Sequence, residues 1–422
     1  MQLKIEKLIY GGKGLGRLEG KATFVPFVIP DEKVQIKIKK EKKNFIEAHL
    51  EQVIEKSPYR REPLCKYFTT CGGCDFQHIQ YEYQIKLKKD ILEEALQRIG
   101  NIKNYPEIKT IPSEKEFFYR NRAQFKVYAN HIGFYKRESH TVIDIDNCPI
   151  LSKQIAYIPD KLKELITYFI VQPKEIHIFS ATEGNLLKFI FDKQIKKYPD
   201  LKTINKILGI NIVGAGIYYR KNQTVYLQKT LGQKFTFEKI KNFRFKVSLD
   251  SFFQVNKFQI KNLIDTVISF LKNSKTIADM YCGVGTFSIP AGKIVDKVYG
   301  FELNKIAVKD AVENAKINNV KNSQFYPFET KKAVDFLIEK NIPVDTIIFD
   351  PPRSGLNKYI IDKTSKIKTL EKIVYVSCNP TTLARDLNDF SKKGFSIKQI
   401  YMIDMFPQTY HIETITFLTK NS

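Results

Sequence analysis

A strand that runs directly into a helix at Val376-Ser377-Cys378-Asn379-Pro380 is typical of an open α/β sheet. The apolar, β-branched run 372–376 predicts a buried strand, and the threonines that follow open a helical pattern. Open α/β sheets bind their ligands at such corners, and the helix N-terminus there favours a thiolate over a thiol. Cys378 is therefore a candidate nucleophile, although a lone cysteine is more often a small buried core residue.

Two further runs place carboxylates at strand ends. The apolar run 347–349 ends in Asp350, and the two prolines behind it force the chain to leave the sheet with Asp350 at its edge. The run 411–418 alternates as a strand does, and Glu413 is its only acid. Because a lone acid in a strand is usually solvated, a structural role is the default for Glu413.

A glycine turn follows the predicted strand at 276–281. Gly283 and Gly285 are placed so that the backbone can approach a ligand closely. The next strand ends at Glu302, seventeen residues beyond Gly285, where an acid can accept hydrogen bonds from ribose hydroxyls. Ser288 stands where a third glycine would complete a dinucleotide loop. The spacing therefore predicts an adenosine-ribose site that fits S-adenosylmethionine better than NAD.

The cysteine spacing predicts a metal site. Three cysteines form the pattern CxxxxxCxxC and a fourth follows far downstream, at Cys65, Cys71, Cys74 and Cys148. Four thiolates can close a tetrahedral zinc site or ligate an iron-sulfur cluster, and the spacing alone does not choose between them. The proline after the fourth cysteine is also a feature of ferredoxin-type ligation, which slightly favours iron-sulfur.

The first segment, 1–56, has short strand-like runs separated by turn residues, which predicts a small five-stranded barrel. The whole chain carries 69 basic and 45 acidic residues, and its formal charge of +24 suggests a polyanionic partner such as nucleic acid. A lysine-rich compositional bias accounts for part of this charge. Neither a long apolar span nor a secretory signal is evident, so we expect a cytoplasmic protein without a membrane partner.

The sequences SCNPTTLARD, FDPPR and PQTYHIET resemble motifs of the uracil-C5 RNA methyltransferase family, and 1–56 resembles its RNA-binding TRAM barrel. The resemblance implies that Cys378 attacks carbon 6 of uracil and that Glu413 later removes the carbon 5 proton. It implies that S-adenosylmethionine is bound by Gln254, Tyr281, Glu302 and Asp350. The similarity of CKYFTTCGGCDFQH and NCP to the iron-sulfur-bearing members implies a [4Fe-4S] cluster on Cys65, Cys71, Cys74 and Cys148.

The predicted fold is α/β and has three parts. These are an OB-like TRAM barrel (1–56), a β-rich central domain with the cluster (57–240) and a Rossmann-like class I methyltransferase domain (241–422). A predicted amphipathic helix at about 81–99 is expected to pack on the catalytic domain. The expected enzyme is a monomer that methylates uracil carbon 5 in RNA. Ribosomal RNA is the preferred substrate, because the resemblance associates the barrel and the cluster with the ribosomal branch of the family, and transfer RNA is the nearest alternative.

Three other functions agree less well with these motifs. Amine methylation of adenine uses a similar DPP motif, but an aromatic residue follows the prolines there, where this chain has Arg353. Cytosine-C5 methylation shares the thiolate mechanism but leaves Glu413 unexplained. A non-catalytic iron-sulfur RNA-binding protein is the alternative from a different class, and the intact Cys378, Glu413 and cofactor positions disfavour it.

Overall fold

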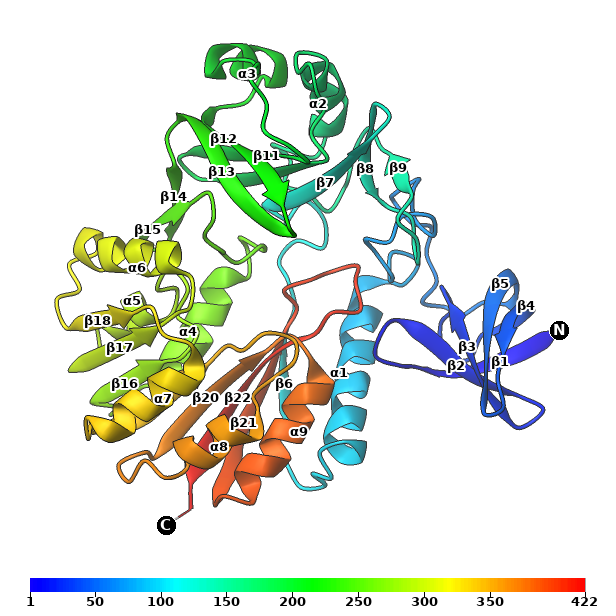
Figure 1. The fold of residues 1–422 in the computed structure, drawn as a ribbon. Coiled ribbons are helices and arrows are strands. Elements are labelled where there is room, and N and C mark those ends of the chain that lie inside the picture. The colour runs from blue at the N-terminus through cyan, green and yellow to red at the C-terminus, as the bar shows by residue number, and fades with distance from the viewer. Residues whose placement is uncertain (422) are drawn as a thin grey trace.

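The computed structural model describes residues 1–421 and divides them among a barrel, a central sheet and a large C-terminal sheet (Figure 1). The N-terminal strands are β1 (Gln2–Leu8), β2 (Lys13–Leu18), β3 (Lys21–Pro26), β4 (Lys33–Glu41) and β5 (Phe45–Glu55). They form a closed barrel in the order β1-β2-β3-β5-β4, which leaves no free sheet edge among them. Alternate apolar side chains, such as Ile5, Val25 and Val34, fill its interior. The predicted OB-like barrel is confirmed.

The central sheet has seven strands in the order β13-β12-β11-β10-β7-β8-β9. They are β7 (Arg122–Tyr128), β8 (His131–Tyr135), β9 (Val142–Asp144), β10 (Glu175–Ala181), β11 (Gly184–Phe191), β12 (Ile212–Lys221) and β13 (Thr224–Gly232). The helices α2 (Ile158–Ile166) and α3 (Leu201–Leu208) pack against the sheet and share its apolar core. A hairpin of β14 (Phe235–Ile240) and β15 (Phe243–Ser248) then leads into the C-terminal domain.

The C-terminal domain contains an eight-stranded sheet in the order β18-β17-β16-β19-β20-β22-β21-β6. The strands are β16 (Thr276–Asp279), β17 (Lys297–Phe301), β18 (Ser323–Tyr326), β19 (Thr346–Phe349), β20 (Lys372–Ser377), β21 (Phe395–Ile403), β22 (Glu413–Lys420) and β6 (Ile108–Ile111). The strands from β18 to β20 are parallel, whereas β22 runs antiparallel to β20 and β21. The predicted Rossmann-like fold is confirmed.

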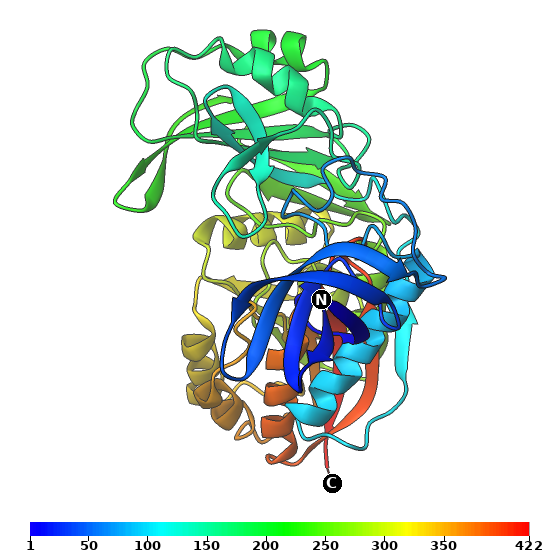
Figure 2. The same ribbon diagram turned by 90° about the vertical axis from the view of Figure 1, so that its right-hand side faces the viewer.

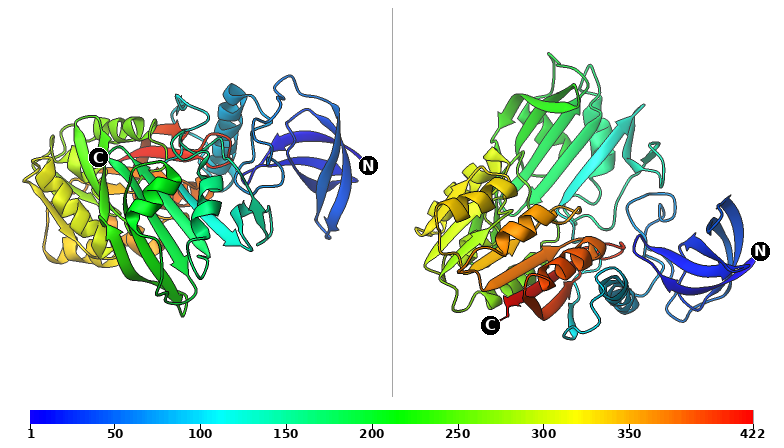
Figure 3. Two further views of the ribbon diagram at one scale, coloured as in Figure 1. Left: turned by 90° about the horizontal axis from the view of Figure 1, so that it is seen from above. Right: turned by 60° about the horizontal axis from the view of Figure 1, so that its bottom comes forward.

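Helices cover both faces of this sheet, which explains why its central strands are apolar on both sides (Figure 3). On one face lie α4 (Ile260–Phe270), α5 (Ser288–Ala291) and α6 (Lys305–Ile317). On the other face lie α1 (Tyr81–Arg98), α7 (Thr330–Glu339), α8 (Lys358–Thr364) and α9 (Pro380–Ser391). Each face has its own hydrophobic core. No helix within residues 1–421 combines the length and the apolar character that crossing a membrane requires.

The helix α1 and the strand β6 join the C-terminal domain although they precede the central sheet in the chain. α1 contacts α9, and β6 pairs in parallel with β21 at the sheet edge. An ion pair between Lys7 and Glu94 (2.5 Å) connects the barrel to α1, beside which the barrel lies (Figure 2). The segment 57–240 is therefore shared between two structural units, and β6 is an addition that the sequence does not predict.

Candidate active site

Three of the four predicted cofactor residues lie at one rim of the C-terminal sheet. In the strand register, Asp279 at the end of β16 is level with Gly300 on β17 and with Ile348 on β19. Two positions further along these parallel strands come Tyr281, Glu302 and Asp350. The carboxyl ends of adjacent parallel strands thus place an aromatic ring and two carboxylates side by side, where open α/β sheets bind ligands.

Glu302 also holds the glycine turn in place. Its carboxylate accepts hydrogen bonds from the backbone N–H groups of Gly283 (3.2 Å) and Asn304 (2.8 Å). Gly285 has a φ of +90°, which a residue with a side chain rarely adopts. The turn after β16 and the end of β17 are therefore tied together around the predicted adenosine-ribose site.

Gln254, the fourth predicted cofactor residue, comes from a loop and not from a strand end of the C-terminal sheet. It lies half-buried between β15 and α4, and its backbone carbonyl accepts a hydrogen bond from Asn121 (3.3 Å). No hydrogen bond within the described residues joins the Gln254 side chain to the other three. Its segment nevertheless reaches the rim, because Asn304 donates a hydrogen bond to the Asp250 carbonyl (2.8 Å).

Cys378 and Glu413 lie across from each other at the ends of two paired strands. The last pair in the antiparallel register of β20 and β22 is Ser377 with Thr414, so the next position places Cys378 opposite Glu413. The Thr414 hydroxyl donates a hydrogen bond to the Ser377 carbonyl (3.1 Å) and secures this register. Glu413 is only 5% exposed, so the expectation of a solvated strand acid is wrong.

The electrostatics of Cys378 differ from the sequence-based expectation. A helix N-terminus should favour the thiolate, but burial raises the pKa of the Cys378 thiol to about 11, with further contributions from Glu413 and Asp350. Arg353 acts in the opposite direction. The N-terminus of α9 is also occupied, because the Asn379 side chain accepts a hydrogen bond from Thr381 N–H (3.0 Å). Desolvation and two nearby acids outweigh the helix dipole, so the resting group is a thiol.

The carboxylates of the rim influence each other. Burial, followed by the charge of Asp279, raises the pKa of Asp350 to about 7. Burial and the charge of Asp350 raise the pKa of Glu413 well above its usual range. Asp279, which the sequence reasoning did not assign, accepts a hydrogen bond from the Ser288 hydroxyl (2.6 Å). Its other carboxylate oxygen is buried without a partner within residues 1–421. A cluster of buried acids of this kind suits a cationic ligand.

Arg353 and His411 also belong to the site, and sequence reasoning gave them no role. The Arg353 guanidinium lies 3.2 Å from His411 Nε2. Since arginine only donates, His411 Nε2 must accept, which requires a neutral imidazole. Burial and the charge of Arg353 lower the pKa of His411 to about 3, which agrees with this assignment. Both residues stand inside the quoted motifs FDPPR and PQTYHIET, which was the available signal.

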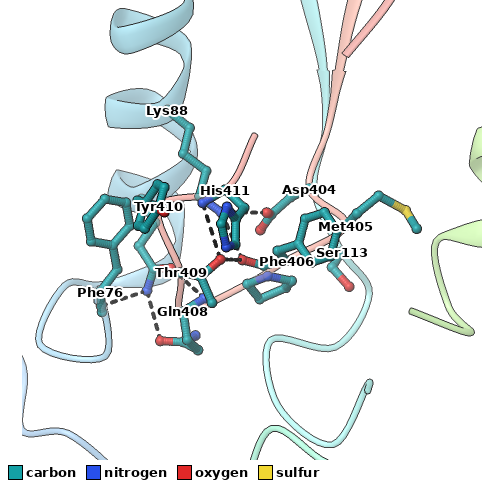
Figure 4. Close-up of polar contacts among 12 residues, drawn as sticks. Phe76, Lys88, Ser113, Asp404, Met405, Phe406, Gln408, Thr409, Tyr410 and His411 are labelled. Atoms are coloured by element: carbon teal, nitrogen blue, oxygen red, sulfur yellow. Dashed lines mark hydrogen bonds and ion pairs between the residues drawn. The ribbon is translucent and has the colours of Figure 1, made fainter. Parts of the chain in front are cut away.

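Buried polar contacts from α1 hold the segment 404–411, which forms most of the connection between β21 and β22 (Figure 4). Lys88 Nζ lies 2.7 Å from Asp404 Oδ1, and both side chains are buried. Gln84 donates a hydrogen bond to the Gln408 side chain (3.1 Å) and accepts one from the Gln408 backbone (3.1 Å). These contacts determine how the chain enters β22, at whose first position the predicted base stands.

A model of the family described as tRNA (Uracil-5-)-methyltransferase matches residues 80–421, and a TRAM domain model matches residues 1–50. The chain belongs to the tRNA (uracil-5-)-methyltransferase family. It is an S-adenosylmethionine-dependent RNA methyltransferase of the uracil-5 type, as the sequence predicts.

Relatives of this family match the chain over its full length. An uncharacterized RNA methyltransferase of Aquifex aeolicus is 40% identical over 420 residues, covering 99% of this chain and 98% of its own. An uncharacterized RNA methyltransferase of Fusobacterium nucleatum is 36% identical, covering 100% of this chain and 96% of its own. The crystal structure of Pyrococcus abyssi tRNA (uracil-54, C5)-methyltransferase in complex with S-adenosyl-L-homocysteine has a TM-score of 0.78 and 28% identity. It covers 99% of this chain and 100% of its own.

The four cysteines of the predicted metal site lie together in this protein, but they do not surround a position for a single metal ion. Cys65, Cys71, Cys74 and Cys148 line one cavity of about 220 Å³. Phe68, Phe134 and Leu151 also contribute to its walls. Burial raises the pKa of every one of these thiols. Within residues 1–421, no three His, Cys, Asp or Glu side chains gather as a site for a single metal ion.

Proposed function

We propose that this enzyme methylates carbon 5 of a uridine in RNA through a covalent bond between Cys378 and uracil carbon 6. The placement of Cys378 opposite Glu413 at the rim that also carries Asp350 is the observation that supports this proposal most directly. A nucleophile, a base and a cation-binding carboxylate are the groups that the reaction requires. Gln254, Tyr281 and Glu302 complete the proposed cofactor site.

The reaction needs a nucleophile because uracil carbon 5 is a poor one until a thiolate adds to carbon 6. The Cys378 sulfur forms a bond to carbon 6, and the electron pair of the ring double bond moves into an enolate. Carbon 5 takes the methyl group that bound S-adenosylmethionine would supply, and the S–CH3 bond would break to leave the neutral thioether S-adenosylhomocysteine. Glu413 then accepts the carbon 5 proton, the bond between sulfur and carbon 6 breaks, and the thiolate returns as the double bond re-forms.

The buried acids suit this sequence of steps. In the absence of ligand, the pKa values of Cys378, Glu413 and Asp350 are all raised, because burial and the neighbouring acids disfavour the ionised form of each group. A sulfonium beside Asp350 favours the ionised form of each nearby acid. Cofactor binding therefore prepares both the nucleophile and the base, and we expect it to precede attack on uracil.

Ribosomal RNA remains the proposed substrate, and transfer RNA is the second candidate. The likeness to the Pyrococcus abyssi enzyme favours the second, because that enzyme is named for uracil 54 of transfer RNA and matches 99% of this chain. The barrel by itself therefore does not select ribosomal RNA. A monomer located in the cytoplasm remains part of the proposal.

We further propose that Cys65, Cys71, Cys74 and Cys148 hold a [4Fe-4S] cluster with a structural role. Four thiols around a cavity of about 220 Å³, without a tight triad for one ion, suit a group larger than zinc. Methyl transfer requires no electron carrier, so the cluster would fasten segments far apart in sequence. Anaerobically purified protein should be brown and contain iron and acid-labile sulfide. Stoichiometric zinc without sulfide would reject the cluster.

RNA labelled with tritium at uracil carbon 5 tests the reaction. Ribosomal and transfer RNA are incubated separately with enzyme and S-adenosylmethionine, and release of tritium to water should match methyl incorporation. Full methylation with retained tritium would show that an atom other than uracil carbon 5 is methylated. Cys378→Ala should bind S-adenosylmethionine but form no bond to RNA. Glu413→Gln should accumulate a methylated RNA adduct that survives denaturing electrophoresis, because the proton cannot leave.

A further inference from the structure

The turn between β1 and β2 of the N-terminal barrel reaches the catalytic site of the C-terminal domain. The turn is closed by hydrogen bonds from Ile9 N–H to Lys13 (2.9 Å) and from Gly12 N–H to Ile9 (3.0 Å). Gly12, with a φ of +81°, packs so closely that an added Cβ would lie 3.3 Å from Tyr410 Cβ. The right-hand view of Figure 3 shows this hairpin extending from the barrel towards the segment before β22.

Tyr10 is the side chain that this turn presents to the site. Its ring packs edge-on against Tyr410, with centroids 5.4 Å apart. The Tyr410 ring lies 4.3 Å from that of His411, which in turn contacts Arg353 at 3.2 Å. A chain of contacts thus leads from the barrel to the groups around Cys378.

The ring of Tyr10 has partners, but its hydroxyl does not. Tyr10 is half-buried against the C-terminal core, and no hydrogen bond within residues 1–421 uses its hydroxyl. Burial raises the pKa of Tyr10 to about 12, the neighbouring Tyr410 adds most to this, and Cys378 and Glu413 add less, whereas Arg353 acts in the opposite direction. The hydroxyl is therefore a neutral donor on a ring that packs against Tyr410, which itself contacts His411.

We propose that the Tyr10 hydroxyl donates a hydrogen bond to the target nucleotide, so that the barrel completes the catalytic site in addition to anchoring RNA. Uracil offers two carbonyl oxygens, and negative charge develops in the ring when the thiolate adds. A neutral phenol beside Tyr410 can donate to such an oxygen when the base is bound next to Cys378. This inference rests on the proposed uracil methylation, and it assigns a substrate contact to a residue of the barrel.

The competing explanation is that Tyr10 only fastens the barrel to the C-terminal domain. Tyr10→Phe separates the two roles, because it keeps the ring and its packing on Tyr410 while removing the hydroxyl. Tyr59→Phe is a matched control, since Tyr59 also stacks on a tyrosine, Tyr83 (3.9 Å), and its hydroxyl has no hydrogen bond within residues 1–421.

The test compares wild type, Tyr10→Phe and Tyr59→Phe by tritium release from ribosomal and transfer RNA labelled at uracil carbon 5. We expect Tyr10→Phe to lower kcat/KM for RNA about tenfold, the typical loss for one hydrogen bond to a reacting group. Its affinity for S-adenosylmethionine and its melting temperature should stay at wild-type values, and Tyr59→Phe should behave as wild type. Equal kcat/KM for the two variants would overturn the proposal, as would a loss that accompanies a lower melting temperature.

A photocrosslinking experiment tests whether Tyr10 contacts RNA, independently of which reaction the enzyme catalyses. RNA containing 4-thiouridine is bound to wild-type enzyme, irradiated and digested, and crosslinked peptides are identified by mass spectrometry. A crosslink on the peptide that contains Tyr10 supports the contact, and its absence overturns it. If wild type releases no tritium, the proposed function fails, and the crosslink still decides whether Tyr10 touches the RNA.

Discussion

Replacing Glu413 with glutamine should make Cys378 easier to alkylate, although it removes the proposed base. Burial is the main reason that the pKa of the Cys378 thiol is raised, and the carboxylates of Glu413 and Asp350 add to it because they repel a thiolate. Alkylating reagents attack the thiolate form. Glu413→Gln removes an acid whose ionised form repels the thiolate, so the pKa of the thiol falls and the reactive fraction grows.

The structure bounds the size of this effect. The pKa of Cys378 is raised from an ordinary value of 9.0 to about 11, which lowers the thiolate fraction at neutral pH about a hundredfold. Burial is the largest cause and remains in the variant, so the substitution recovers only part of this factor. We expect alkylation at about pH 8 to become faster on the order of tenfold.

Iodoacetamide and quantitative mass spectrometry of the Cys378 peptide provide the assay, because they separate this thiol from the other cysteines. Arg353→Gln is the control variant with the opposite expected effect, since Arg353 lowers the pKa of Cys378 and its loss should slow alkylation. Melting curves of both variants check that the fold is intact. If Glu413→Gln reacts no faster than wild type, or if both variants change in the same direction, this account of the Cys378 environment is wrong.

Three further predictions concern other parts of the molecule. Because the pKa of Asp350 is raised to about 7, affinity for S-adenosylmethionine should fall as the pH drops below about 7, and calorimetry should find this dependence weakened in Asp350→Asn, where Asp279 remains. Lys88→Met leaves Asp404 buried without its 2.7 Å partner, so urea unfolding should show a loss of about 3–5 kcal/mol. Gly214→Ala would place a Cβ 1.8 Å from the Gln233 carbonyl oxygen, and the melting temperature should fall.

The architecture was predictable because its signals are local. Each apolar run of the C-terminal domain is one buried strand, and the residues after those runs, among them Glu302, Asp350 and Cys378, gather at the rim because parallel strands end together. The barrel follows from short alternating runs and turn residues in the same way. The register then places Glu413 opposite Cys378, a relation that sequence spacing alone does not contain.

The ionisation state of the site was not predictable from the same signals. Sequence identifies Cys378 at the start of a helix and predicts a lowered thiol pKa, whereas the structure raises it. The cause is the set of residues around the thiol, because Asp350 and Glu413 come from other strands and are themselves buried. Desolvation depends on everything that covers a residue, and a local motif records only the dipole of its own helix.

The segment 404–411 shows why the most distant contributions escape sequence reasoning altogether. It receives Lys88 and Gln84 from α1 on one side and Gly12 of the barrel on another. A buried ion pair such as that of Lys88 is weak evidence for stability, because desolvating two charges costs about what their attraction returns. What the pair provides is a fixed position for the start of the segment, and the hydrogen bonds between Gln84 and Gln408 hold its middle. The barrel turn then docks against a segment that is already held, so a side chain near the N-terminus meets the catalytic groups near the C-terminus in one geometry.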